Sequence, residues 1–302
     1  MARLEHAAFD GTQGTLSRCC SFLTESERSY GFLRNWSVAR LEDWRYGNNF
    51  RFETTDPSFF SRNLHYWRRE GEVVGLSVSG ADNVVTPMVL PDDWETEGEI
   101  LTWTEKVWSK DKQTTRIAAY DDDFARVQEL ETRGFERRES RGFVRKYDTS
   151  TAPQESKSPE GFVLTTLAEH GNIIDYVDAV RSAFGRDTLD IKWFKSKERA
   201  PGYAREWVIC ALVGDRVASF CEVRVDQRGG YAELDPIGTR PEHQRKGLAR
   251  ALIAESFRRL SAARIGRAYI GSASEPDPSN HLYDSLEPAE KREEFAWEKT
   301  LA

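Results

Sequence analysis

A Ser-, Thr- and Pro-rich stretch near the middle of the chain, residues 149–160, most constrains what this sequence can fold into. It contains no large apolar residue, and it shows neither the period of a strand nor that of a helix. Such a composition is typical of a linker between domains. The chain of 302 residues is long enough for two cores of ordinary size. The sequence therefore predicts two domains, residues 1–148 and 161–302, joined by this linker.

The segment after the linker alternates apolar strand patterns with helical patterns. A Gly-Asp turn at 214–215 joins two of the predicted strands into a hairpin. Strands are predicted at 161–168, 207–213, 216–225, 231–239, 268–274 and 294–301, and helices at 173–184, 247–265 and 280–286. This mixture predicts an α+β domain, in which a mixed, mostly antiparallel sheet is flanked by helices.

The segment before the linker repeats this plan less clearly. Strands are predicted at 72–79, 84–90, 115–120 and 136–147, with helices at 98–108 and 122–133. The order of elements matches that of the later segment, which predicts a structural duplication. The alternative is a pair of unrelated α+β domains.

A polar loop between the strand at 231–239 and the helix that follows it has the character of an anion site. The first turn of a helix leaves its backbone N–H groups unpaired, and the helix dipole favours negative charge there. A glycine allows close approach of the backbone, a small alanine leaves room beside it, and three basic side chains add positive charge. The residues are Gln244, Arg245, Lys246, Gly247, Leu248, Ala249 and Arg250. They predict a pyrophosphate site; the alternative is an ordinary basic helix start.

A second motif follows the next predicted strand. The sequence Asn-His-Leu-Tyr-Asp-Ser-Leu at 280–286 puts Asn280 and Tyr283 on one face of a helix. With the loop, it resembles the GNAT superfamily of N-acetyltransferases, whose hallmark is a strand, a (Q/R)-x-x-G-x-(G/A) loop and a helix, followed later by an asparagine and a tyrosine. The resemblance covers 161–302 and predicts two tandem acyl-CoA N-acyltransferase-like domains.

The resemblance implies acetyl-CoA as the acyl donor and an amine as the acceptor. It implies that the backbone at Ile237 and Thr239 bonds the pantetheine arm and the acyl carbonyl. It implies that residues 244–250 hold the pyrophosphate through main-chain N–H groups and that Asn280 contacts the cofactor. Tyr283 would protonate the departing thiolate; the alternative is an interfacial aromatic with its hydroxyl in water.

The chemistry of the acceptor calls for a base, because an amine is protonated at neutral pH and must lose a proton before it attacks a thioester. Glu233 stands where a subset of the family places its general base. Strand alternation puts Tyr231, Glu233 and Asp235 on one face. The two carboxylates are therefore candidate catalytic residues, the alternative being a solvated strand face.

The sequence also departs from the family pattern. Leu286 is followed by Glu-Pro rather than Gly-Phe, and Pro236 removes an N–H from the strand. In the segment before the linker, five carboxylates lie within 91–99, where a pyrophosphate loop would belong. We therefore predict a degenerate N-terminal copy that does not bind CoA, a plan similar to that of mycothiol synthase, and whose other role would be to wall the acceptor site.

Composition excludes several other classes of protein. The net charge of −7 argues against a nucleic-acid binder, and no apolar run approaches the roughly 20 residues of a membrane span. Residues 1–6 lack the apolar core of an export signal, so we expect a cytoplasmic protein. The five histidines show no metal spacing, so no metal is expected, and we expect the four cysteines to be buried free thiols.

The leading hypothesis is an N-acetyltransferase that works by direct attack of the amine in a ternary complex, because no cysteine lies near the predicted site to form an acyl-enzyme. Two alternatives are a CoA-binding regulatory module that has lost turnover, and a scaffold in which the loop is merely a helix start. The sequence leaves open whether the acceptor is a small molecule or a peptide, which acyl chain is transferred, and whether the protein is a monomer or a homodimer.

Overall fold

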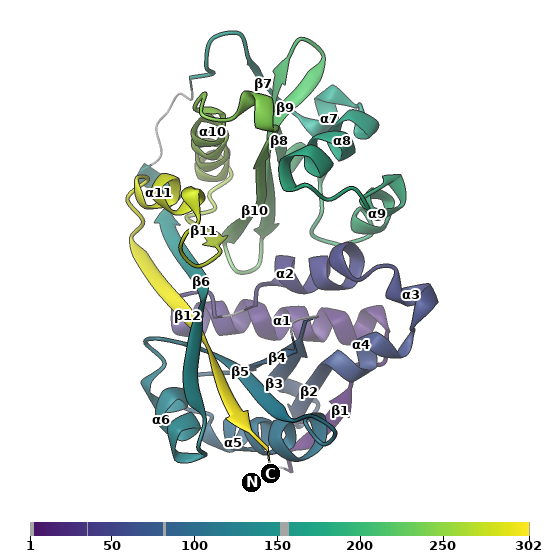
Figure 1. Cartoon of the computed structure of the whole chain (residues 1–302), viewed down its shortest axis with the longest axis vertical. Helices are drawn as coiled ribbons and strands as arrows, with labels where there is room; N and C mark the ends of the chain where they lie inside the picture. The colour runs from purple at the N-terminus through teal and green to yellow at the C-terminus, as the bar shows by residue number, and fades with distance from the viewer. Residues whose placement is uncertain (1–2, 35, 81–82, 152–156, 302) are drawn as a thin grey trace.

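The computed structural model describes residues 3–34, 36–80, 83–151 and 157–301. Its described strands form one twelve-stranded sheet in the order β1-β2-β3-β4-β5-β12-β6-β11-β10-β9-β8-β7. Figure 1 shows two lobes, a lower one with β1–β5 and an upper one with β7–β11. The predicted linker begins with the short 3-10 turn η3 (Thr149–Thr151), and its residues 152–156 lie outside the described residues.

The N-terminal half, up to residue 151, contributes the elements of the lower lobe and one further strand. Its strands are β1 (Glu5–Ala8), β2 (Leu64–Arg69), β3 (Glu72–Ser79), β4 (Val84–Val89), β5 (Thr114–Tyr120) and β6 (Glu136–Asp148). Its helices are α1 (Gln13–Tyr30), α2 (Val38–Glu42), α3 (Phe52–Thr55), α4 (Ser58–Asn63), α5 (Trp94–Trp103) and α6 (Phe124–Thr132), with π-helical segments η1 (Asp43–Asn48) and η2 (Thr104–Trp108).

The C-terminal half, from residue 157, contributes the upper lobe and the last strand. Its strands are β7 (Val163–Thr166), β8 (Val208–Val213), β9 (Arg216–Asp226), β10 (Tyr231–Thr239), β11 (Arg267–Ser272) and β12 (Glu290–Thr300). Its helices are α7 (Leu167–His170), α8 (Ile173–Phe184), α9 (Ile191–Lys197), α10 (Leu248–Ala262) and α11 (Pro278–Asp284), with 3-10 turns η4 (Arg205–Trp207) and η5 (Pro241–His243).

Most predicted elements form, and local chemistry explains where their bounds differ. The strand predicted at 161–168 ends at Thr166, because the Thr166 side chain accepts a hydrogen bond from the Glu169 backbone and Glu169 bonds back in a capping box. The chain therefore turns into α7 at Leu167. The closing strand predicted to begin at 294 begins at Glu290, where it already pairs with Lys146 of β6.

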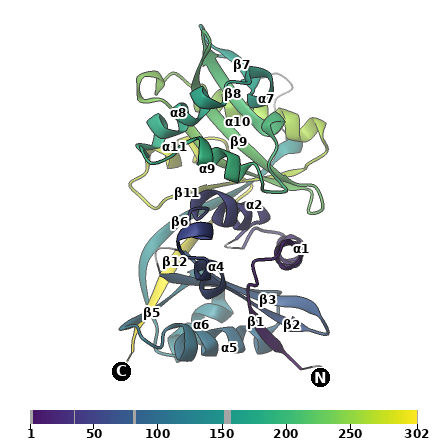
Figure 2. The ribbon, with the colours of Figure 1, turned by 90° about the vertical axis from the view of Figure 1, so that its right-hand side faces the viewer.

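The two halves exchange their last strands. Strand β12, from the C-terminal half, pairs with β5 over Glu294–Thr300, while β6, from the N-terminal half, pairs with β11 over Arg267–Ser272. The two exchanged strands also pair with each other at the centre of the sheet. Figures 1 and 2 show β12 running down from the upper lobe into the lower one. Each lobe is therefore completed by a strand from the other half of the chain.

The exchanged strands carry core residues with them. Phe295 and Trp297 of β12 are buried among Ile117, Leu130 and Phe135 of the lower lobe. Burying aromatic side chains of this size is among the largest apolar contributions a single residue makes to folding. The lower lobe therefore depends on the C-terminal strand for part of its core.

Helices α1 and α2 lie between the lobes (Figures 1 and 2). The apolar face of α1 packs in the core of the lower lobe, and acidic side chains of both helices reach the upper lobe. The carboxylate of Glu27, on α1, accepts hydrogen bonds from Arg267 at 2.9 Å and from the Tyr269 hydroxyl at 2.8 Å. Glu42, at the end of α2, pairs with the buried Arg224. Because these acidic side chains are almost fully buried, their ion pairs hold the lobes in one arrangement.

Candidate active site

Strand β10, which carries the candidate base, separates from its neighbour β11 part-way along its length. Strands β10 and β11 pair in parallel only over Tyr231–Glu233 of β10, and the register with β9 shifts between Leu234 and Ile237. Pro236 lies in this interval, and it has no N–H to give to a ladder. From Ile237 to Thr239, β10 is paired with β9 alone. The edge of β10 that faces β11 is therefore open at both positions predicted to bond the pantetheine arm.

The predicted anion loop lies where β10 leads into α10. Gly247 caps the helix in the left-handed region, with φ 79°, and no side chain bonds its first turn. Among described helices of nine or more residues, the others are all capped by a side chain, from Thr12, Asp93, Asp123 or Asn172. The first N–H groups of α10 are therefore the ones left available to an anion.

The side chains of the loop leave this backbone open. Leu248 is buried and anchors the helix, and Ala249 is half-buried. The others, Gln244, Arg245, Lys246, Gly247 and Arg250, are exposed. Lys246 Nζ donates to the backbone oxygen of Glu242 at 3.1 Å, and Gln244 Nε2 to that of Thr239 at 3.3 Å. Positive charge thus surrounds the start of the helix without blocking it.

The corresponding helix of the lower lobe, α5, has its start occupied by acidic groups. The Asp93 carboxylate accepts a hydrogen bond from the Thr96 backbone at 3.2 Å, and Glu95 and Glu97 lie in the first turn. Arg69 pairs with Asp93 and Glu95. A phosphate at this position would meet carboxylates that already fill it, so α5 is unsuited to hold a pyrophosphate.

The two candidate carboxylates of β10 lie in different environments. Glu233 is 6% exposed and accepts a hydrogen bond from the Ser37 hydroxyl of the N-terminal half. Asp235 is exposed and lies at the wall of two cavities. Although the side chain opens to these cavities, the protein around them displaces much of its water. This desolvation, then the charges of Glu233 and Asp43, raise the pKa of Asp235 to about 6. Asp235 is the carboxylate that a ligand can reach.

Helix α11 carries both residues of the second motif, Asn280 and Tyr283, and the two side chains lie in different environments. Tyr283 is 7% exposed, and burial raises the pKa of its phenol above the ordinary value. Asn280 is buried, and its Oδ1 accepts hydrogen bonds from Arg145 at 3.0 Å and from Ser272 at 2.6 Å. Its Nδ2 donates to the backbone oxygen of Ala273 at 3.2 Å. The Asn280 side chain thus fixes α11 to the sheet.

Arg145 of β6 holds the Asn280 side chain in place, and the sequence pattern did not single it out. Its side chain is fully buried, and it bonds Asp284 at 2.5 Å and Ser272 at 2.8 Å in addition to Asn280. A signal was present in the sequence, because period-two alternation puts Arg145 on the same face as Phe143 and Tyr147. An arginine on an apolar strand face is rare unless it is paired.

A cavity of about 270 Å³, here called the acceptor cleft, lies against β10 between the lobes. Its charged and aromatic lining includes Arg40, Tyr120, Arg141, Glu233, Asp235 and Glu294. Arg141 pairs with Glu294 at 2.7 Å. Burial disfavours the charge of Arg40, but Glu233 and Glu294 outweigh it and raise the Arg40 pKa. Arg40, Tyr120 and Arg141 belong to the N-terminal half, so that half forms part of the wall of the cleft.

Of the four thiols, those of Cys19, Cys210 and Cys221 are buried and that of Cys20 is half-buried. The four cysteines are free, and burial raises the pKa of each thiol well above its usual value. Buried thiols of this kind are unreactive. Among the described residues, no cluster of three or more His, Cys, Asp or Glu has the geometry of a metal site. The described helices include none that is both long and apolar enough to cross a membrane.

A known protein family matches the part of the chain that contains this site. Residues 173–286 match the family model of the acetyltransferase (GNAT) family. This segment of the chain is similar to the GNAT family. The matched segment contains β10, the loop, α10 and α11, the elements that form the site. No curated protein matches the sequence.

Solved structures match the chain over nearly its whole length. A tandem GNAT protein from the clavulanic acid biosynthesis pathway has a TM-score of 0.66 at 12% identity, covering 99% of this chain and 98% of its own. A GCN5-related N-acetyltransferase from Sphaerobacter thermophilus has a TM-score of 0.62 at 16% identity, covering 98% and 95%. An acetyltransferase from Colwellia psychrerythraea has a TM-score of 0.59 at 10% identity, covering 98% and 100%. These likenesses confirm the predicted tandem α+β fold.

Proposed function

We propose that this protein is an N-acetyltransferase, which transfers the acetyl group of acetyl-CoA to an amine acceptor in a ternary complex. The observation that carries the proposal is a single strand, β10, which presents Asp235 to the acceptor cleft and leads into the uncapped start of α10. The donor site and the candidate base therefore lie on one continuous segment of chain.

The donor would lie along the open edge of β10. Its pyrophosphate would bind at the N–H groups of the first turn of α10, with Arg245, Lys246 and Arg250 supplying charge. Its pantetheine arm would reach Ile237 and Thr239, where β10 has no pairing with β11. The thioester would then lie at the opening between the strands, beside the acceptor cleft.

Asp235 is the better candidate for the general base, and Glu233 for a supporting role. A pKa of about 6 keeps Asp235 ionised at neutral pH, yet makes it a stronger base than an ordinary aspartate. Asp235 would take a proton from the ammonium group of the acceptor, directly or through water. Glu233 is occupied by Ser37, and its charge contributes to the raised pKa of Asp235.

Transfer then requires one attack and two proton movements. The free amine attacks the carbonyl carbon of the thioester, the C–S bond breaks, the sulfur leaves as a thiolate, and the new amide nitrogen releases its extra proton to water. Tyr283, whose raised pKa keeps the phenol protonated, would donate a proton to that thiolate. Contrary to the expectation from the sequence, one cysteine lies beside the site, because Cys221 of β9 pairs with Ile237. Its thiol is fully buried, and burial raises its pKa. Such a thiol does not suit an acyl-enzyme, which supports direct transfer to the amine.

The proposal is tested by incubating the purified protein with acetyl-CoA and a broad panel of amines, and following the release of free thiol. The proposed function predicts release above the hydrolysis blank with at least one amine, and an acetylated product in the mass spectrum. Calorimetry with CoA separates the alternatives. CoA binding without turnover on any amine favours a regulatory module, and the absence of binding rejects the donor site.

A further inference from the structure

Asp235 borders a second cavity besides the acceptor cleft. This cavity, here called the α8 cavity, has a volume of about 150 Å³ and is lined by residues of α8, α9, η1 and β10 and of the segment between α8 and α9. Leu234, which precedes Asp235 on β10, belongs to the core that α10 covers. Because successive residues of a strand point to opposite faces, Asp235 points away from α10. An acceptor whose nitrogen lies at Asp235 can therefore extend into the α8 cavity.

Apolar side chains form much of the lining of the α8 cavity. They are Val180 and Phe184 of α8, Leu189, and Trp193 of α9. Gly185 ends α8 in the left-handed region directly after Phe184, and the Phe184 side chain is 42% exposed. Trp193, by contrast, is 6% exposed and packs in the core with α8. The lining thus combines an aromatic ring held by the core with one that is open to a ligand.

Two of the charged residues of the α8 cavity neutralise each other. Asp43 pairs with Lys197 at 3.4 Å, and it also pairs with the buried Arg224 at 3.1 Å. Arg186, the other basic residue of the lining, is exposed, and its guanidinium lies 5.7 Å from the centroid of Phe184. The carboxylate of Asp43 therefore needs no cation from a ligand, and the cavity offers a guanidinium beside an aromatic ring.

The volume of the α8 cavity suits a single ring. An apolar cavity of about 150 Å³ in another protein holds a benzene molecule, and the α8 cavity has about the same volume, 150 Å³. Phe184 and Trp193 allow the offset and edge contacts that aromatic rings prefer. The guanidinium of Arg186 is attracted to the face of such a ring. A saturated group of the same size would gain burial but neither of these contacts, so the lining favours an aromatic ring.

We propose that the acceptor is a primary amine that carries an aromatic ring on a short linker, with its nitrogen at Asp235 and its ring in the α8 cavity. This inference rests on the proposed acetyl transfer, whose acceptor it specifies. Asp235 takes the proton of the ammonium group. Contacts of the ring with Phe184 and Trp193 hold the nitrogen in place for attack on the thioester.

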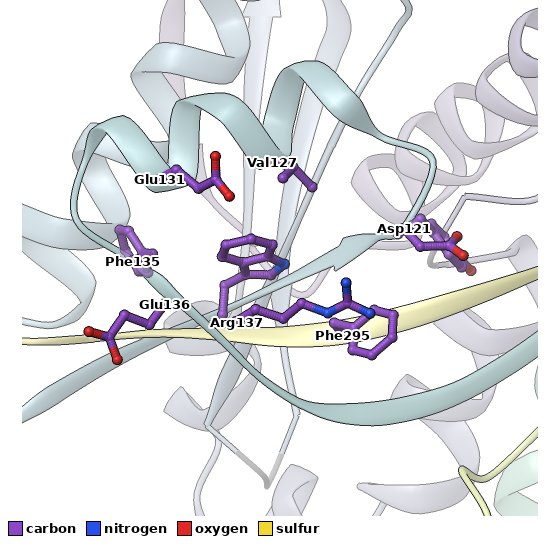
Figure 3. Close-up of a pocket in the computed structure, with 9 residues that line it drawn as sticks. Asp121, Val127, Glu131, Phe135, Glu136, Arg137 and Phe295 are labelled. Carbon is purple, nitrogen blue, oxygen red and sulfur yellow. The ribbon is translucent and has the colours of Figure 1, made fainter.

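The lower lobe contains a larger cavity, of about 410 Å³, which also has room for a ring. Figure 3 shows Val127 and Glu131 of α6 on one side of it, and Arg137 and Phe295 of the strands on the other. The guanidinium of Arg137 already lies 3.3 Å from the centroid of Phe295. The lining of this cavity includes no residue of β10, so a ring held there would not bring an amine to the candidate base. A variant of Val127 therefore serves as a control.

The probe is 2-phenylethylamine. It is compared with 2-cyclohexylethylamine, which has a similar shape without a π system, and with ethanolamine, which has no ring. Thiol release from acetyl-CoA by the full chain gives kcat/KM for each amine. The value for 2-phenylethylamine is expected to exceed that for ethanolamine by at least about tenfold and that for 2-cyclohexylethylamine by about threefold, because the ring gains burial, aromatic and cation–π contacts.

Phe184→Ala is expected to lower kcat/KM for 2-phenylethylamine by about tenfold, mainly through KM, because it removes the open aromatic wall of the cavity. An unchanged affinity for CoA reports that the variant is folded. Ile174→Ala is the matched control, since Ile174 is an exposed apolar residue of the same helix and lies outside the cavity. Ile174→Ala and Val127→Ala are both expected to leave the preference for the aromatic amine unchanged.

The inference is overturned if either control amine is used as well as 2-phenylethylamine, if Phe184→Ala retains the preference, or if Val127→Ala loses it. It is also overturned, with the proposed function intact, if other amines release thiol and 2-phenylethylamine does not. Calorimetry with the CoA-bound protein separates the two proposals from the other side. Saturable binding of 2-phenylethylamine that is lost in Phe184→Ala, without thiol release from any amine, would support the ring site and reject the proposed transfer.

Discussion

The guanidinium of Arg145 donates a hydrogen bond of 3.0 Å to Oδ1 of Asn280. The first residue belongs to the last strand of the N-terminal half, and the second to the helix that carries Tyr283. The bond therefore makes the placement of the candidate general acid depend on the other half of the chain. This dependence leads to the first prediction.

Replacing Arg145 by lysine is expected to lower kcat more than it changes the affinity for acetyl-CoA. Lysine keeps the charge but cannot bond Asn280, Ser272 and Asp284 at once, which costs about 2 kcal/mol of local stability. Steady-state kinetics and calorimetry measure the two effects. Arg138→Lys is the matched control, because Arg138 is an exposed arginine on the same strand. An unaltered kcat in Arg145→Lys would remove the positioning role.

Gly247→Glu is expected to abolish CoA binding. The new carboxylate would face the pyrophosphate, and like charges in contact cost several kcal/mol, so affinity should fall by at least about 100-fold. Gly247→Ala separates charge from backbone strain, because it shares the φ of 79° and a Cβ at this position meets no atom within 4 Å. Retained affinity in the glutamate variant would show that the pyrophosphate binds elsewhere.

The pH dependence of transfer is expected to follow Asp235. The base must be ionised to accept a proton, so kcat/KM should rise with pH through about 6, the raised pKa of this carboxyl, and then level off. Asp235→Asn should remove this limb and lower kcat by roughly 100- to 10,000-fold, the range of a lost general base. A pH profile that persists in Asp235→Asn would move the base to Glu233.

Ionisation of the Asp235 carboxyl, which is expected to raise the rate of transfer, is expected to lower the stability of the folded protein. Its folded-state pKa of about 6 lies above its ordinary value near 3.9, so the folded state holds the proton more tightly. The stability contributed by the protonated form is complete below about pH 4 and is lost as the pH rises through 6. Asp235→Asn should therefore raise Tm at pH 8, with a smaller gain at pH 4. Thermal unfolding at both pH values tests the sign.

Tyr283→Phe is expected to lower kcat with little change in CoA affinity, because the phenol acts on the departing thiolate and the ring remains in the core. Burial raises the pKa of this phenol above the ordinary value, so it stays protonated across the neutral range and should add no alkaline limb below about pH 10. Equal rates for the two proteins would assign the proton to another donor.

Cutting the chain between Thr151 and Lys157 tests the strand exchange. Each half alone lacks the strand that completes its lobe, so we expect neither to fold separately, and the two to purify as a complex when they are expressed together. CoA binding should appear only in the complex. A C-terminal half that binds CoA by itself would show that β6 is dispensable for the site.

The sequence by itself determined the local chemistry of the site. The loop at 244–250, the strand at 231–239 and the helix carrying Asn280 and Tyr283 were all predictable, because each depends on neighbours within a few residues. The acidic start of α5 was equally readable, since the carboxylates at 91–99 act on the helix that they begin.

Only the tertiary structure decided which groups meet across the chain. Ser37 on Glu233, Arg145 on Asn280 and Arg40 in the acceptor cleft all join residues more than a hundred positions apart. The pairing of β12 with β5 is equally remote. Strand alternation predicts which face of the sheet a residue occupies. It does not predict which strand lies beside it, because any strand with a matching apolar face satisfies the same pattern. The exchange of β6 and β12, and with it the joint acceptor cleft, therefore had to come from the fold.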